Sequence, residues 1–471
     1  MGSRAIGLVG TLIVTRFITP ADYGEVSVAA VLVMTANQLS TIGFGQYLIA
    51  KPNAPRSLAF HVTSFHVLLG VLTLGLLLAG GGALGPALDA PRMARFLPGL
   101  VLSGLLDRVA YVPERILVRD LRFGPLSMAR TVGDLAHSAV SVTLAALGWG
   151  GTAIVMGNVV RSGARMFAFV ASVERRDWLE PCRLSLRQTR ELVAFGVPMA
   201  LGALCAFAAR RWDNLLVSRL FGPGPTGMYN LAYNLADVPA IQVGEQIGDV
   251  LLPSFARLEV ARRPAALLRS MALLSLVVFP LAVGLGAVAP TLVAVIFDAR
   301  WRPLAPMLVL LSALSVARPI GWTVASYLQA RELPRLIFWL EAFKLVLLVG
   351  GILTFGRRSP LWTCVAVGVS FAVHALASLW VVRQIDHVSL RRSLGSVVPA
   401  LGACLVLVAA VLLVRSGLLA WGNVRPALAL AFEVLGGALG YVLAALVLAR
   451  DASRDLIAKL RDALHSHPVP E

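Results

Sequence analysis

The chain has 471 residues, of which 58% are hydrophobic and 14% are charged, with 42 basic against 25 acidic residues. Soluble proteins carry about 25% charged residues, so this composition excludes a soluble globular protein and indicates a membrane protein. The basic residues form short clusters between long apolar runs, a pattern typical of the cytoplasmic loops of polytopic proteins, so it argues against a nucleic-acid partner.

A helix needs about 20 apolar residues to cross the hydrocarbon core of a bilayer. With Gly, Pro and charged clusters as limits, the first six expected spans are 2–18, 25–49, 57–85, 96–117, 125–147 and 150–173. Six more are expected at 191–219, 226–255, 266–296, 304–329, 335–355 and 360–383, and two at 395–415 and 425–449. The sequence therefore predicts an all-α polytopic membrane protein of about 14 transmembrane helices.

The connections between these spans predict the topology. Lys and Arg concentrate in every second connection, starting with the N-terminus, which places both termini in the cytoplasm by the positive-inside rule. The tail from Asp451 carries apolar residues at helical spacing beside Arg and Lys. It is expected either to lie on the inner surface as an amphipathic helix or to be a solvated tail.

One short motif occurs twice, as "TRFITPADYG" (15–24) and "SRLFGPGPTG" (218–227). An arginine, a proline and a glycine match at one constant offset of 203 residues, pairing Arg16, Pro20 and Gly24 with Arg219, Pro223 and Gly227. Six predicted spans separate the two copies, so both face the outer side. This favours two six-helix lobes related by an axis along the membrane normal, as in many secondary transporters. The expected domains are a lobe at 1–190, a lobe at 191–385, and two further helices with the tail at 386–471.

Charged residues within the spans are costly and require either internal pairing or a watery cavity. Two pairs have the spacing of neighbours on one helix, Arg130 with Asp134 and Glu341 with Lys344, which favours structural ion pairs. Arg161 and Arg165 are like charges four residues apart, which is unfavourable without a nearby anion.

The predicted seventh and eighth helices carry opposite charges, Arg210, Arg211 and Asp213 on one and Asp237, Glu245 and Asp249 on the other. These groups either pair across the helix interface or line a cavity in which arginines bind phosphate. The four acids are also candidates for proton or sodium coupling. Arg318 is a further basic residue within a span and a candidate substrate ligand.

The order and spacing of several stretches resemble the polysaccharide transporters of the multidrug/oligosaccharidyl-lipid/polysaccharide superfamily, the Wzx-type oligosaccharide flippases. They are "RFITPADYGEVSVAAVLVMTANQLSTIGFGQYLIAK", "RRWDNLLVSRLFGPGPTGMYNLAYNLADVP", "VLLPSFARLEV" and "FPLAVGLGAVAPTLVAVIFDARWRPLAPML". The resemblance extends from Thr15 to about Arg383.

This resemblance implies two lobes around a central cavity in the inner membrane. It also implies flipping of undecaprenyl-pyrophosphate-linked oligosaccharides by alternating access, for capsule, O-antigen or exopolysaccharide synthesis. The implied partners are the lipid-linked oligosaccharide, membrane lipids, and polysaccharide polymerase and export machinery. The family's cationic lumen suggests substrate roles for Arg16, Arg210 and Arg211.

Two other functions remain open. A drug or cation antiporter of the same superfamily would favour an acidic cavity, which the acids of the eighth helix support and the arginines oppose. A membrane glycosyltransferase or polymerase would need a large catalytic loop. We expect no catalytic residue, no metal and no cofactor.

Overall fold

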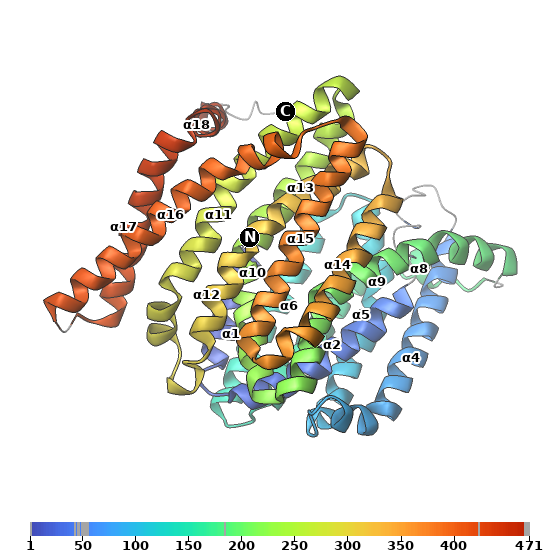
Figure 1. Ribbon diagram of the computed structural model, residues 1–471. Helices are drawn as coiled ribbons and strands as arrows, with labels where there is room; N and C mark the ends of the chain where they lie inside the picture. The colour runs from blue at the N-terminus through green and yellow to red at the C-terminus, as the bar shows by residue number, and fades with distance from the viewer. Residues whose placement is uncertain are drawn as a thin grey trace. The chain divides into compact units, whose positions relative to one another are not determined.

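The protein is helical throughout the part that its computed structural model describes, residues 2–41, 44, 48, 56–182, 185–422 and 424–465 (Figure 1). No strand occurs in those ranges. The all-α prediction is therefore confirmed. The chain forms two compact units, Met1–Asn230 and Leu231–Glu471. The domain limits expected at residues 190 and 385 stay predictions.

The first unit is built mainly from long helices. These are α1 (Gly2–Val14), α2 (Pro20–Thr41), α4 (Arg56–Ala87), α5 (Leu97–Arg119), α6 (Phe123–Ala146), α7 (Gly151–Ala171) and α9 (Leu186–Phe221), with the short helices η1 (Met93–Arg95) and α8 (Arg176–Leu179). Helix α10 (Pro223–Arg257) begins in this unit and continues into the second. Buried apolar side chains from α2, α5 and η1, including Val28, Met93 and Leu97, form one core cluster of this unit.

The second unit is also built mainly from helices. Its helices are α11 (Arg263–Ile296), α12 (Leu304–Leu314), α13 (Arg318–Ala330), α14 (Pro334–Thr354), α15 (Pro360–Asp386), α16 (Leu390–Trp421), α17 (Pro426–Leu448) and α18 (Arg450–His465), with short 3-10 turns η2 (Val260–Arg262), η3 (Ala299–Trp301), η4 (Ser315–Ala317) and η5 (Gly356–Arg358). The expected span at 304–329 is divided by η4 just before Pro319, which has no amide hydrogen to continue the helix.

The two helices that start within the repeated motif, α2 and α10, begin earlier than expected. Helix α2 starts at Pro20 rather than residue 25, because Thr19 caps it: its Oγ1 accepts a bond from the amide of Asp22 at 3.1 Å and donates to the Asp22 carboxylate at 2.9 Å. A proline suits the first turn, where the amide hydrogen has no partner. Helix α10 likewise starts at Pro223, immediately after Gly222, whose φ of 76° ends α9. The predicted start was five residues late for α2, at 25 rather than Pro20, and three residues late for α10, at 226 rather than Pro223.

Many of the helices are suited to a membrane. Within the described residues, eight helices are long and apolar enough to span a bilayer, including α4, α7, α14 and α15. Helices α16 and α17 pack against each other beside α11 (Figure 1), and they expose apolar side chains such as Leu413 and Leu443. Exposed leucines of this kind are expected where lipid replaces water. The total of about 14 spans stays a prediction.

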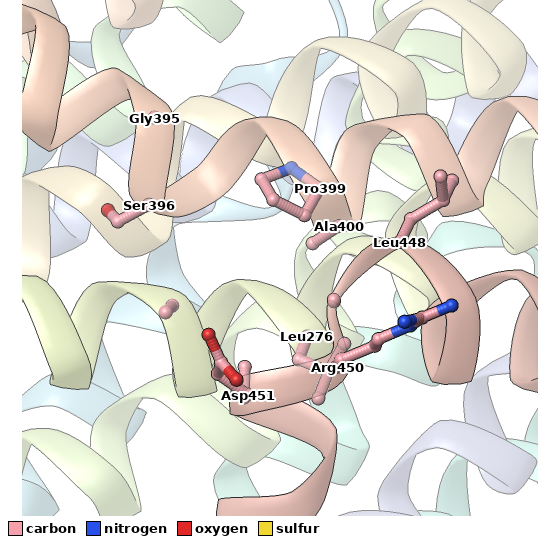
Figure 2. A pocket seen from close by; sticks show the side chains of 11 residues that line it. Leu276, Gly395, Ser396, Pro399, Ala400, Leu448, Arg450 and Asp451 are labelled. Carbon is pink, nitrogen blue, oxygen red and sulfur yellow. The ribbon is translucent and has the colours of Figure 1, made fainter.

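The tail from residue 450 forms helix α18 over its described part, and its position on the inner surface stays a prediction. Arg269 of α11 holds it with two hydrogen bonds to the Asp455 carboxylate, one of them 2.6 Å long. A pocket of about 210 Å³ lies where α17 turns into α18, and Figure 2 shows Pro399, Ala400 and Leu448 on its walls beside Asp451. None of the predicted site residues lines it.

Candidate functional site: charged side chains within the helices

Both arginines of α7 have a described partner, which lies on α7 itself for Arg161 and on α6 for Arg165. Arg165 lies 2.6 Å from the Asp134 carboxylate of α6, whereas Arg130 lies 2.6 Å from Glu114 of α5. The predicted pairing of Arg130 with Asp134 is therefore wrong, since each finds its partner on another helix. Of the like charges Arg161 and Arg165, the first donates to Asn158 at 2.6 Å and the second is neutralised by Asp134.

One buried arginine of the first unit was not included in the predicted site. Arg108 of α5 is 3% exposed, and its guanidinium donates to Asn37 Oδ1 at 2.9 and 3.0 Å and to the Asn37 carbonyl at 2.7 Å. It also bonds to Ser40 and lies 3.2 Å from a ring nitrogen of His66. These hydrogen-bond partners carry no formal negative charge. Spacing offered no signal for this cluster, because its members come from three helices.

Helix α9 carries both exposed and buried charges. Arg210 is exposed and donates its Nε hydrogen to the Ala206 carbonyl at 3.3 Å, whereas the next residue, Arg211, is half-buried. Adjacent residues point about 100° apart on a helix, which explains the difference. Arg16 follows α1 in a turn and is exposed.

Asp213, one turn after Arg210, is fully buried. Its carboxylate accepts hydrogen bonds from the Tyr229 hydroxyl at 2.5 Å and from the Asn214 side chain at 3.0 Å, and Asn214 in turn accepts one from Asn230 at 2.8 Å. The hydrogen bonds described for this carboxylate therefore come from neutral donors on α9 and α10.

In the second unit, a predicted substrate ligand and a predicted coupling acid are joined. Arg318 of α13 forms an ion pair with Asp237 of α10, and its guanidinium lies 4.8 Å from the ring centres of both Tyr233 and Phe371. Glu245 and Asp249, on the same helix as Asp237, have side chains outside the described residues.

The pairing of Glu341 with Lys344 is confirmed at 2.5 Å. Lys344 also lies 5.4 Å from the Phe371 ring centre, and His374 lies 3.8 Å from Glu341. The second unit thus places several buried ionisable groups next to one another, with carboxylates beside the cations. This charge balance is what an apolar environment requires.

Helices α16 and α17 contain another ion pair. Glu433 is 1% exposed and accepts from Arg415 at 2.8 and 2.9 Å and from the Thr291 hydroxyl at 2.8 Å. The sequence placed Arg415 at the end of a span in an outer segment. The helix instead continues to Trp421, so Arg415 lies within it.

The family of this chain follows from comparison with known proteins. A family described as "Polysaccharide biosynthesis protein" matches residues 13–306. The chain belongs to this family. The resemblance noted from the sequence motifs is thereby confirmed.

Two relatives of this family member have curated names. The lipopolysaccharide biosynthesis protein WzxC of Escherichia coli (strain K12) is 23% identical over 367 residues, which cover 78% of this chain and 73% of that protein. The succinoglycan biosynthesis transport protein ExoT of Rhizobium meliloti (strain 1021) is 23% identical over 394 residues, covering 82% and 78%.

Solved structures show the same fold. The lipid II flippase MurJ in an inward closed conformation matches with a TM-score of 0.77 and 13% identity, covering 95% of this chain and 97% of that one. An inward-facing multidrug resistance MATE family transporter of the MOP superfamily matches with a TM-score of 0.60 and 16% identity, covering 81% and 94%. With its apolar helices, this polysaccharide biosynthesis family member is a multi-pass membrane protein.

Proposed function

We propose that this protein is a flippase that moves undecaprenyl-pyrophosphate-linked oligosaccharides across the inner membrane, with both termini in the cytoplasm. The two relatives, one named for lipopolysaccharide and one for succinoglycan biosynthesis transport, support a substrate of this class. The flippase acts by alternating access, and no cofactor is required. Capsule, O-antigen and exopolysaccharide are the products it serves, with the polymerase and export machinery as partners.

The observation that carries the proposal is the exposed arginine of α9. Arg210 lies well inside a 36-residue helix, and a charge at the centre of a span costs about 2.5–3.5 kcal/mol when it faces lipid. An exposed arginine at this depth is therefore best accommodated on a water-filled path. Its planar guanidinium suits a phosphate, and Arg108, whose described hydrogen bonds go to neutral groups, is a second arginine of the same unit.

This charge distribution supports an anionic substrate over the cationic substrates of a drug antiporter. The pyrophosphate is held by arginines while the polyprenyl chain stays in lipid, so the helices need not enclose the whole molecule. Arg16, Arg161, Arg165, Arg211 and Arg318 are the other candidate ligands. Arg165 and Arg318 are engaged by carboxylates, which makes them weaker candidates than Arg210.

Coupling to a proton or sodium gradient supplies the driving force in this proposal. Among its four candidate acids, Asp213 stands out, because a buried carboxylate that is hydrogen-bonded by neutral donors gains most from binding a proton. Asp237 is already paired with Arg318.

A complementation experiment tests the proposal. A strain lacking the gene receives Arg210→Glu, Arg210→Lys or the wild-type gene, and lipid-linked repeats and exported polymer are measured. Arg210→Glu should abolish export and leave repeats on the cytoplasmic leaflet, while lysine should retain part of the activity because it keeps the charge. Arg190→Glu, which reverses an exposed arginine near the start of the same helix, is the control. Wild-type export by Arg210→Glu, with equal protein in the membrane, would refute a role for Arg210 in anion binding.

A further inference from the structure

The two copies of the repeated motif touch each other through their glycines. A Cβ atom placed on Gly24 would overlap the carbonyl oxygen of Pro223 and lie 2.9 Å from the Gly227 amide nitrogen. A Cβ atom on Gly227 would overlap the carbonyl oxygen of Pro20 and lie 2.9 Å from the Gly24 amide nitrogen. Helices α2 and α10 therefore cross in backbone contact at this point, which we call the glycine crossing.

The contacts at the glycine crossing are reciprocal, as they are at an interface formed across a two-fold axis. The offset of 203 residues converts Pro20 into Pro223 and Gly24 into Gly227, so the contact of Gly24 with Pro223 maps onto that of Gly227 with Pro20. Such self-complementary contacts arise where equivalent surfaces meet across a two-fold axis. The motif is thus repeated because each copy packs on the other, and only glycine permits so close an approach.

A loop from the first unit holds both copies. Arg92, just before η1, lies 3.5 Å from the Asp22 carboxylate and 3.6 Å from that of Glu25, both on α2. Four residues earlier, the Leu88 carbonyl accepts a hydrogen bond of 2.7 Å from Ser218 in the last turn of α9. We call residues 88–92 the strap, since they connect the end of α9 to the start of α2.

We propose that the glycine crossing and its strap form the outer gate of the transport path, closed in this structure and parted when substrate leaves. The inference rests on the proposed function, since a bulky glycan cannot pass where two backbones are in contact. Few features hold the crossing, which suits a reversible contact: glycines that interlock no side chains, the ion pairs of the exposed Arg92 side chain with Asp22 and the buried Glu25, and one hydroxyl bond. Further along α2, contact with α9 continues, because Trp212 of α9 donates a hydrogen bond to the Thr35 hydroxyl of α2 at 3.2 Å.

The gate can be tested without transporting any substrate. Ser27 lies about one turn beyond Gly24 on α2 and is buried, with its hydroxyl bonded to the Tyr23 carbonyl, so Ser27→Cys is a nearly isosteric reporter. It is introduced after the four native cysteines are replaced, and its reaction with an impermeant maleimide is timed on intact cells. Gly24→Val and Gly227→Val are each added to this background.

Overpacking a close contact typically shifts a two-state ratio by about five- to 150-fold, so we expect each valine variant to label at least tenfold faster than its parent. Gly224→Val is the matched control: Gly224 lies in the same first turn of α10, but a Cβ atom there would meet nothing within 4 Å. It should label at the parental rate. Unchanged labelling in both valine variants, at parental membrane levels, would overturn the gate.

A second variant covers the case in which valine prevents folding. Arg92→Gln with Ser218→Ala removes the polar contacts of the strap without adding bulk, and should raise labelling several-fold. Parental labelling in this variant would also overturn the proposal. The labelling rate does not depend on the identity of the substrate. Faster labelling would therefore support the gate even if lipid-linked repeats did not accumulate, whereas that lack of accumulation would count against the flippase function.

Discussion

The ion pair between α16 and α17 allows a quantitative prediction. Glu433 is 1% exposed, whereas the Arg415 side chain is 23% exposed, so the two partners are not equivalent. Arg415→Met leaves an unpaired carboxylate in the interior, and breaking a buried pair in this way typically costs about 3–5 kcal/mol. Glu433→Gln leaves the partly exposed guanidinium instead, and the amide still accepts from Thr291, so its cost should be about 1–3 kcal/mol.

The double variant Arg415→Met/Glu433→Gln should be more stable than Arg415→Met alone, because neutralising the glutamate removes the unpaired charge. Apparent melting temperatures in lipid nanodiscs measure this. A unit of this size shifts by roughly 2–4 °C per kcal/mol, so Arg415→Met should melt roughly 10 °C lower. Arg425→Met, which removes an exposed arginine at the start of α17, is the control. If Arg415→Met melts with the wild type, or the double variant is no better than Arg415→Met, the reasoning about the buried pair is wrong.

Three further predictions concern coupling, topology and the tail. Asp213→Asn should abolish the dependence of transport on the ion gradient at normal expression; unchanged dependence would make Asp213 structural. A single cysteine at Arg357 should react with an impermeant reagent only from outside, and one at Ala261 only from inside. The reverse pattern would refute the topology. Arg269 lowers the pKa of Asp455, so their contact contributes at neutral pH and is lost as pH falls through that lowered value. Asp455→Asn should cost at most about 1 kcal/mol and speed proteolysis of α18 slightly, and this difference should shrink as the pH is lowered.

Local sequence patterns predicted the helices but not which side chains pair between them. Apolar runs predicted the spans, and the cap formed by Thr19 and Asp22 could have corrected the start of α2, since this spacing is a known start signal. The spacing of four residues misassigned Arg130 and Asp134, because both are closer to groups on neighbouring helices. Partners separated by tens of residues, such as Arg415 and Glu433, have no signature in a single sequence.

The repeated motif is a second feature whose spatial contacts could not be predicted from a single sequence. Its matching Arg, Pro and Gly predicted that the corner occurs twice on one face, but not that the copies touch. A glycine can be required by backbone conformation or by close approach, and the sequence does not separate these causes. Gly24 and Gly227 adopt ordinary helical φ values, so close approach is the cause.

Arg108 and Arg210 of the first unit differ in their partners from three cations of the second unit, and this difference bears on where an anion would bind. In the second unit, Arg318, Lys344 and Arg415 each face a carboxylate within the protein. In the first, the hydrogen bonds described for Arg108 and Arg210 go to carbonyl, amide, hydroxyl and imidazole groups. A guanidinium that is already paired with a carboxylate gains little electrostatic energy from binding a phosphate. A guanidinium that is bonded only to neutral groups gains the full charge–charge interaction. We therefore expect the pyrophosphate of the proposed substrate to be bound by Arg210 rather than by a cation that already has a carboxylate partner, such as Arg165 or Arg318.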